Sequence, residues 1–341
     1  MKRIFVFVLA CVMLGSLVLG GVSQVQAGDS ESASVIPAEN KWALLCGSGI
    51  PGQWLLDKWQ PPPGIGGYPY IRDWGPMPPW CYDRTIELRD MLVQQFGFLE
   101  DHITMLINES DTKANFLNAI RDLKTHDGPN SLLFLWTIEH GFEVHDAGSL
   151  IPDSPDTDRL PVPGVESYCN GISTVDAPNR YLRTTGNLPW DHILMFHDSI
   201  PGGQGKYTNM VNFVTEDEFK LLLDELDFQA RFVYFNVQCY GGGFGEGLKG
   251  PNRIIISPAN ADLHQAAGGK HTALLFCALQ GGMTNIPAWC PYRASADLNG
   301  DGRISVEEAY FWIAAASAAT PASARPSFVY MWDGIPGETF L

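Results

Sequence analysis

The sequence predicts an α/β fold in which a mostly parallel sheet is covered by helices on both faces. Short continuous apolar runs alternate along the chain with segments of helical periodicity. The apolar runs do not alternate with polar residues, which is typical of parallel strands buried on both faces. Strand, helix and strand in this order place successive strands in one sheet.

Five runs are expected to be strands: KWALLCGSG (41–49), HITMLIN (102–108), SLLFLWTIE (131–139), FVYFNVQ (232–238) and NRIIISPA (252–259). Three segments between them show the apolar spacing of amphipathic helices: 82–97, 112–124 and 215–227. Thr215 and Glu218 form a capping box at the start of the third segment.

The first 27 residues are interpreted as an export signal. Lys2 and Arg3 precede an apolar run over 4–22, and small residues suited to cleavage end at Ala27. The alternative is an uncleaved membrane anchor. The rest, 28–341, is expected to be a single domain outside the cytoplasm, either secreted or periplasmic.

Two stretches interrupt the alternation and are expected to be insertions at the sheet edge. Residues 50–80 contain eight prolines, and residues 142–210 are rich in Asp, Pro and Gly around one further apolar run, 191–199. Neither has the pattern of a second domain.

The charge of the chain argues against two classes of partner. The formal net charge is −16, and it becomes −18 when Lys2 and Arg3 leave with the signal. Such acidity disfavours nucleic acid and anionic membrane surfaces, so no membrane contact beyond the export signal is expected.

Two expected strands end in residues that can do covalent chemistry together. His140 and Gly141 follow 131–139, and Cys239 follows 232–238. The carboxyl ends of parallel strands meet at one edge, where His140 can take the thiol proton and Cys239 can attack a carbonyl carbon. Backbone N–H groups of Cys239 and Gly141 are the candidate oxyanion hole, and the glycines at 241–243 leave room for a substrate backbone. The alternative is a buried structural cysteine before a glycine turn.

The other histidines and Cys46 have less specific interpretations. His197 also ends an apolar run and is the second candidate for the base, while His145 is placed to line the same cleft. Cys46 is expected to be buried or in a disulfide. The remaining histidines are expected to be surface or core groups: His102, His126, His192, His264 and His271.

Over residues 41–280 the order of motifs resembles the caspase, legumain and gingipain group of cysteine peptidases, and the legumain (hemoglobinase) branch in particular. The quoted segments are KWALLCGSG, GFLEDHITMLIN, TEDEFKLLLDEL and IIISPANADLHQA, with His-Gly and Cys at the two strand ends. The resemblance implies a cysteine endopeptidase acting on proteins or peptides, with Cys239 as nucleophile, His140 as general base and Gly141 in the oxyanion hole.

Three departures from that pattern keep other functions open. The resemblance leads us to expect an acidic or amide residue two positions before the cysteine, and Val237 stands there. Tyr240 and glycines replace Ser-Gly after the cysteine, and the span between His140 and Cys239 is longer than the resemblance implies. An inactive binding or scaffold module is therefore one alternative. A transpeptidase or ligase is another, because an amine can attack the same acyl-enzyme.

The segment ADLNGDGRISVEEA has the spacing of an EF-hand calcium loop. Oxygen ligands are expected from Asp297, Asn299, Asp301, the Arg303 carbonyl and Glu308, with Gly302 at the sharp turn. We expect a structural Ca²⁺ ion here. The alternative is a surface turn before a helix capped by Ser305 and Glu308, since the two patterns share residues.

Overall fold

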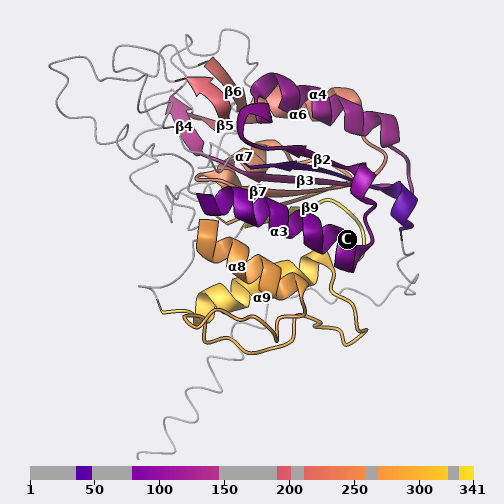
Figure 1. Cartoon of the computed structure of the whole chain (residues 1–341), viewed down its shortest axis with the longest axis vertical. Coiled ribbons are helices and arrows are strands. Elements are labelled where there is room, and N and C mark those ends of the chain that lie inside the picture. The colour runs from indigo at the N-terminus through magenta and orange to yellow at the C-terminus, as the bar shows by residue number, and fades with distance from the viewer. Residues whose placement is uncertain (1–35, 48–78, 146–189, 201–210, 259–267, 322–329) are drawn as a thin grey trace, which may run out of the picture. The chain divides into compact units, whose positions relative to one another are not determined.

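The computed structural model describes residues 36–47, 79–145, 190–200, 211–258, 268–321 and 330–341 (Figure 1). These belong to one compact unit, 35–341. The expected export signal and most of the two expected insertions lie outside the described residues. None of the described helices is long and apolar enough to cross a membrane.

The main sheet has six strands in the order β2-β1-β3-β7-β8-β9. They are β1 (Lys41–Cys46), β2 (Ile103–Leu106), β3 (Leu132–Ile138), β7 (Arg231–Val237), β8 (Arg253–Ser257) and β9 (Tyr330–Asp333). The first five are parallel, and β9 runs antiparallel to β8 at one edge. The predicted α/β class, the five predicted strands and the mostly parallel sheet are confirmed.

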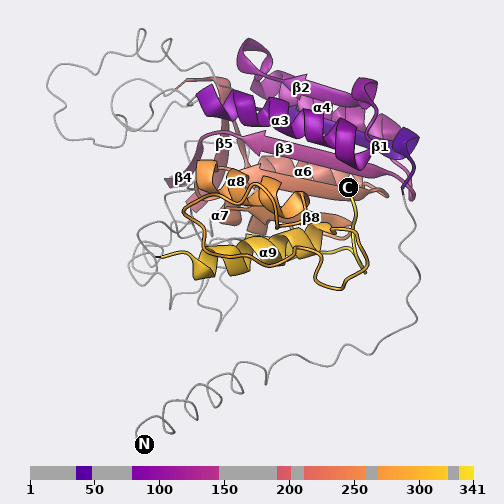
Figure 2. The ribbon, with the colours of Figure 1, turned by 60° about the horizontal axis from the view of Figure 1, so that its bottom comes forward.

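Helices cover both faces of this sheet (Figures 1 and 2). One face packs against α3 (Pro79–Phe96), α8 (Gly268–Leu279) and α9 (Val306–Ala319), and the other against α4 (Lys113–Leu123) and α6 (Glu216–Leu226). Single 3-10 turns occur at η1 (Ala38–Asn40), η3 (Glu100–His102), η4 (Asn108–Ser110) and η5 (Lys124–His126). Trp136 and Phe235 enter the first core, and Leu135 and Tyr234 enter the second, as alternation along a strand requires.

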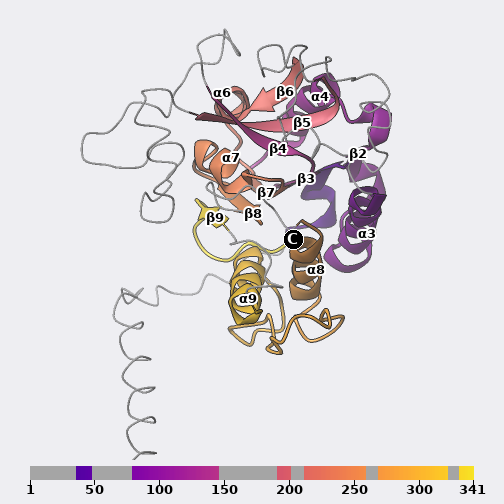
Figure 3. The same ribbon diagram turned by 90° about the vertical axis from the view of Figure 1, so that its left-hand side faces the viewer.

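Three antiparallel strands form a second sheet, in the order β4-β5-β6 (Figure 3). They are β4 (Gly141–His145), β5 (Trp190–Ile200) and β6 (Val211–Thr215). Leu194 and Val214 of this sheet pack into the core beneath α4 and α6. Residues 142–145 and 190–200 of the span expected to be an irregular insertion are therefore in strands, and β4 continues the chain directly from His140.

The predicted helix starts are formed by side-chain caps. Thr215 accepts a hydrogen bond from the Glu218 N–H at 3.0 Å, and the Glu218 carboxylate binds Lys113 of α4 at 2.8 Å. At α9, Ser305 and Glu308 form both bonds of a capping box. The capping box at Ser305 is confirmed. At Thr215 the side-chain cap is confirmed, but the reciprocal bond to Glu218 that a capping box requires is not part of it.

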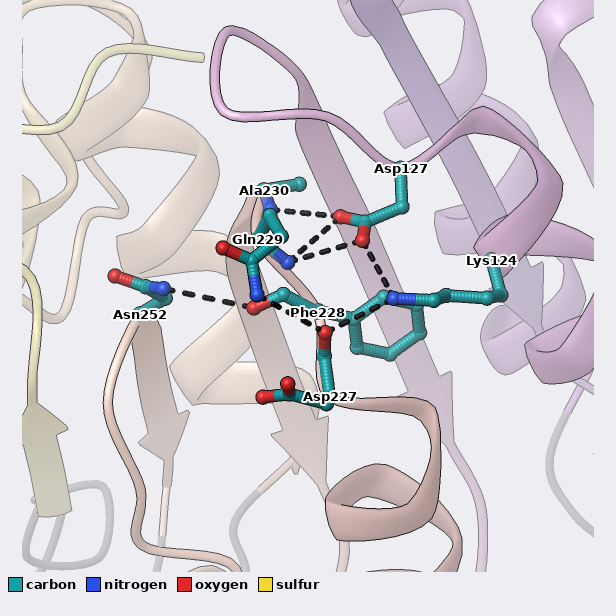
Figure 4. Close-up of polar contacts among 7 residues, drawn as sticks. All are labelled: Lys124, Asp127, Asp227, Phe228, Gln229, Ala230 and Asn252. Carbon is teal, nitrogen blue, oxygen red and sulfur yellow. Dashed lines mark hydrogen bonds and ion pairs between the residues drawn. The ribbon is translucent and has the colours of Figure 1, made fainter.

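Figure 4 shows how a buried carboxylate fixes the start of β7. Asp127 accepts backbone N–H bonds from Gln229 and Ala230, at 2.9 and 2.7 Å, and pairs with Lys124 at 2.7 Å. Burial alone raises the pKa of Asp127, but these hydrogen bonds outweigh burial and hold the pKa below its ordinary value. The network therefore ties the loop before β3 to the loop before β7.

Candidate active site

The two strands that end in chemically capable residues are direct neighbours. In the parallel register of β3 and β7, Ile138 pairs with Val237, and the Glu139 N–H donates to the Val237 carbonyl at 3.2 Å. His140 and Cys239 each lie two residues beyond this last pair. The expectation that both residues lie at the carboxyl ends of adjacent parallel strands is confirmed.

The chain at Gly141 touches the backbone of Cys239. A Cβ atom on Gly141 would lie 2.1 Å from the Cys239 carbonyl oxygen and 2.9 Å from the Gln238 side chain, so glycine is required there. His140 is half-buried, and its carbonyl accepts the N–H of Met195 in β5 at 3.1 Å. The His140-Gly141 segment is thus held between the turn at Cys239 and the second sheet.

Cys239 differs from the other described cysteines in its exposure. Five cysteines lie in the described ranges, and no disulfide joins any two of them. Cys239 is half-buried, and the other four are buried: Cys46, Cys81, Cys277 and Cys290. Burial raises the pKa of Cys81, and it raises the pKa of Cys277 to about 11. A buried thiol with a raised pKa is a poor nucleophile. The accessible described thiol is therefore the one at the strand end.

Cys46, at the end of β1, is buried as expected. Burial, followed by the charges of Asp111 and Glu139, raises its pKa well above the ordinary value. No disulfide joins it to another described cysteine.

The turn after Cys239 has an uncommon backbone conformation. Tyr240 is a non-glycine residue at φ 55°, in the left-handed region, and its side chain is buried. Two side chains from the sheet support the next residue, Gly241. The Asn236 amide donates to the Gly241 carbonyl at 3.1 Å, and a Cβ on Gly241 would lie 2.2 Å from the Ser257 hydroxyl.

The glycines that follow are a helix, α7 (Gly241–Gly247), rather than open backbone for a substrate. Their role is to let other side chains pack closely. A Cβ on Gly243 would meet the His192 ring at 2.3 Å, and one on Gly247 would meet the Glu216 side chain at 2.6 Å. The interpretation of Gly241 and Gly243 as a substrate approach is therefore wrong, because Ser257 and His192 occupy those positions.

His192 has a partner that the sequence did not reveal. Its ring Nδ1 lies 3.3 Å from Glu216 Oε1, and its backbone N–H donates to Glu216 Oε2 at 2.6 Å. Both side chains are buried, beside α7. Glu216 follows the helix cap Thr215, where an acidic residue is ordinary, so the local pattern carried no signal of this pair.

The remaining histidines lie elsewhere or are not described. The side chains of His145 and His197 and all of His264 lie outside the described residues, so the second candidate base stays a prediction. His102 and His126 both stack on Trp42, at 3.5 and 3.3 Å between ring centroids. His271 is fully buried, and desolvation lowers its pKa to about 3, so it remains neutral.

The loop expected to bind calcium is formed by its own hydrogen bonds. Asp297, Asn299 and Asp301 each accept backbone N–H bonds within the loop, and Glu308 accepts them from Leu298, Asn299 and Ser305. The Arg303 guanidinium lies over the Phe340 ring at 3.5 Å. Within the described ranges, no three His, Cys, Asp or Glu side chains are grouped to hold a metal ion. Calcium binding stays a prediction.

Comparisons with known proteins add a limited similarity of fold. No family model matches the chain, and no curated protein sequence matches it. A solved structure from Geobacter sulfurreducens aligns over 87% of this chain and 94% of its own, with 13% identity and a TM-score of 0.46. Caspase-1 from Spodoptera frugiperda aligns over 90% and 91%, with 9% identity and a TM-score of 0.46. The legumain resemblance stays a prediction.

Proposed function

We propose that this protein is a cysteine-type endopeptidase in which Cys239 is the nucleophile and His140 the general base. One observation carries the proposal. Cys239, the half-buried cysteine among those described, lies at the carboxyl ends of the central strands, where Gly141 of the His140-Gly141 segment touches the Cys239 backbone. This is also where the parallel sheet leaves strand ends open to ligands.

In the first half of the reaction, His140 takes the proton from the Cys239 thiol. The thiolate then attacks the carbonyl carbon of the peptide bond, forming a tetrahedral oxyanion. Backbone N–H groups of Cys239 and Gly141 are the proposed donors to that oxyanion. When the carbon–nitrogen bond breaks, the His140 imidazolium gives its proton to the leaving amine, and a thioester to Cys239 remains.

In the second half, His140 takes a proton from water, and the hydroxide attacks the thioester. The acid product leaves and the thiolate regains its proton. An amine in place of water gives a new amide bond and makes the protein a transpeptidase or ligase. Product analysis by mass spectrometry with an added amine nucleophile separates the two outcomes.

An inactive binding module is the second candidate, and the placement of Val237 favours it. Val237 is only 3% exposed and packs in the apolar core, so this position supplies no polar group to a specificity pocket. In such a module Cys239 takes no part in catalysis. Failure to react with any thiol-directed peptide probe would support this function.

The test is a peptidase assay on exported protein, residues 28–341, with fluorogenic peptides varied at the residue before the cut. Cys239→Ala is expected to abolish cleavage. Cys46→Ala is the matched control, because Cys46 ends β1 at the same edge but is buried. Cleavage that survives in Cys239→Ala would reject the proposed nucleophile.

Calcium is the proposed structural cofactor of the 297–308 loop. The motif supports it, together with Glu338, which binds Asn299 at 2.8 Å. Desolvation and then the charges of Glu308 and Asp301 raise the pKa of Glu338, so negative charge is crowded at this loop. To bind one ion, the loop carboxylates would have to turn away from the backbone N–H groups whose hydrogen bonds they now accept.

A further inference from the structure

His192 of β5 and Glu216 at the start of α6 form a pair with almost no exposure to solvent. The two side chains are 0% and 1% exposed. Glu216 accepts two bonds from one residue, the backbone N–H of His192 at 2.6 Å and its ring Nδ1 at 3.3 Å. Two contacts to one carboxylate fix both the position and the rotation of the imidazole.

The pair fills the face of α7 that lacks side chains. The Nε2 edge of the His192 ring faces Gly243, with Nε2, Cδ2 and Cε1 at 2.3, 2.5 and 2.6 Å from the position of a Cβ there. Glu216 occupies the corresponding position at Gly247, one helical turn later. These glycines allow the backbone of α7 to approach His192 and Glu216 directly.

The helix α7 begins only two residues after Cys239. Tyr240 separates Cys239 from the first residue of α7, and its carbonyl accepts the Phe244 N–H at 3.2 Å. The Tyr240 ring lies 6.1 Å from the His192 ring, between centroids. The left-handed backbone at Tyr240 persists only where its surroundings hold it, and His192 is among those surroundings.

We propose that the Glu216–His192 pair is a positioning device for the Cys239 thiol, an inference that rests on the proposed peptidase function. Glu216 accepts the Nδ1 proton of His192 and turns its Nε2 edge to α7, which holds the Tyr240 turn and the nucleophile. Apolar side chains would fill this space without the desolvation cost of a carboxylate. The polar pair therefore specifies orientation in addition to packing.

The experiment replaces Glu216 by Gln, which keeps the shape and removes the charge. Glu218→Gln is the matched control, since Glu218 lies on the same helix but pairs with Lys113 at the surface. Three quantities are measured on the exported chain: kcat and KM on the fluorogenic peptide, the melting temperature, and the rate at which iodoacetamide alkylates Cys239, resolved by peptide mass spectrometry.

We expect Glu216→Gln to lower kcat at least tenfold with KM within twofold, since a displacement of about 1 Å at a reacting group costs on the order of 100-fold in rate. The alkylation rate at Cys239 is expected to fall at least threefold, and Glu218→Gln to leave all three quantities unchanged. Unchanged kcat and alkylation with a lowered melting temperature would show a purely structural pair and overturn the proposal. If the wild-type protein cleaves no peptide, the proposed function fails, and the alkylation rates still decide whether the pair positions Cys239.

Discussion

Replacing Gly243 by Ala tests the close packing of α7 against His192. The added methyl would lie 2.3 Å from His192 Nε2, much closer than carbon and nitrogen atoms approach without a shift. A contact this short places the cost in the upper part of the usual overpacking range, at about 2–3 kcal/mol. Ala in place of Gly in a helix returns about 1 kcal/mol, so the net loss is about 1–2 kcal/mol.

Thermal unfolding followed by circular dichroism measures this loss. At ~2.1 cal/mol/K per residue, a chain of this length unfolds with an entropy of roughly 0.7 kcal/mol/K, so we expect the melting temperature of Gly243→Ala to fall by about 1–3 °C. Gly128→Ala is the control, because its methyl would lie at an ordinary 3.4 Å from the Ser131 hydroxyl. In the double variant with His192→Ala, the methyl has room, so Gly243→Ala should cost little there. A Gly243→Ala protein that melts at or above the wild-type temperature would refute the packing.

Three further predictions concern stability and thiol chemistry. Asp127→Ala leaves two backbone N–H groups without an acceptor and should cost about 2–3 kcal/mol at pH 7 in urea unfolding. The pKa of Asp127 is lowered in the fold, so its stabilisation is present above pH ~4 and is lost at lower pH. The difference in unfolding free energy between wild type and variant should therefore shrink at low pH. Ca²⁺ at 100 times its Kd should raise the stability of the wild type by about 2.7 kcal/mol and leave Asp297→Ala unchanged, and equal melting temperatures with Ca²⁺ and with chelator would contradict the site. Iodoacetamide at pH 7.5 should modify Cys239 before the four buried described cysteines, and faster labelling of Cys46 would contradict the assigned nucleophile.

The main sheet was predictable because its strands are continuous apolar runs between amphipathic helices. The runs at 131–139 and 232–238 became β3 and β7 within a residue or two at each end. The edge strand β9 and the sheet β4-β5-β6 were missed, because β4, β6 and β9 have only four or five residues each and β5 lies in a span rich in Asp, Pro and Gly. The helix α7 was missed because five of its seven residues are glycine, a composition that disfavours helix unless tertiary packing compensates.

The candidate site was predictable only where it follows strand ends. His140 and Cys239 could be placed at one edge because the carboxyl ends of parallel strands coincide there. The pair of His192 and Glu216 could not, since it joins β5 to α6 across 24 positions and forms only when both pack on α7. Whether a histidine is buried beside a carboxylate depends on tertiary contacts that neither residue's local sequence encodes.

The most direct measurement is the rate of peptide cleavage by wild type, Cys239→Ala, His140→Ala and Cys46→Ala at matched concentrations. If the proposal holds, wild type and Cys46→Ala cleave the peptide, and both Cys239→Ala and His140→Ala lose activity. Each variant must keep the wild-type melting temperature within a few degrees, so that lost activity is not lost folding. Full cleavage by folded Cys239→Ala, or by folded His140→Ala, would contradict the assigned dyad.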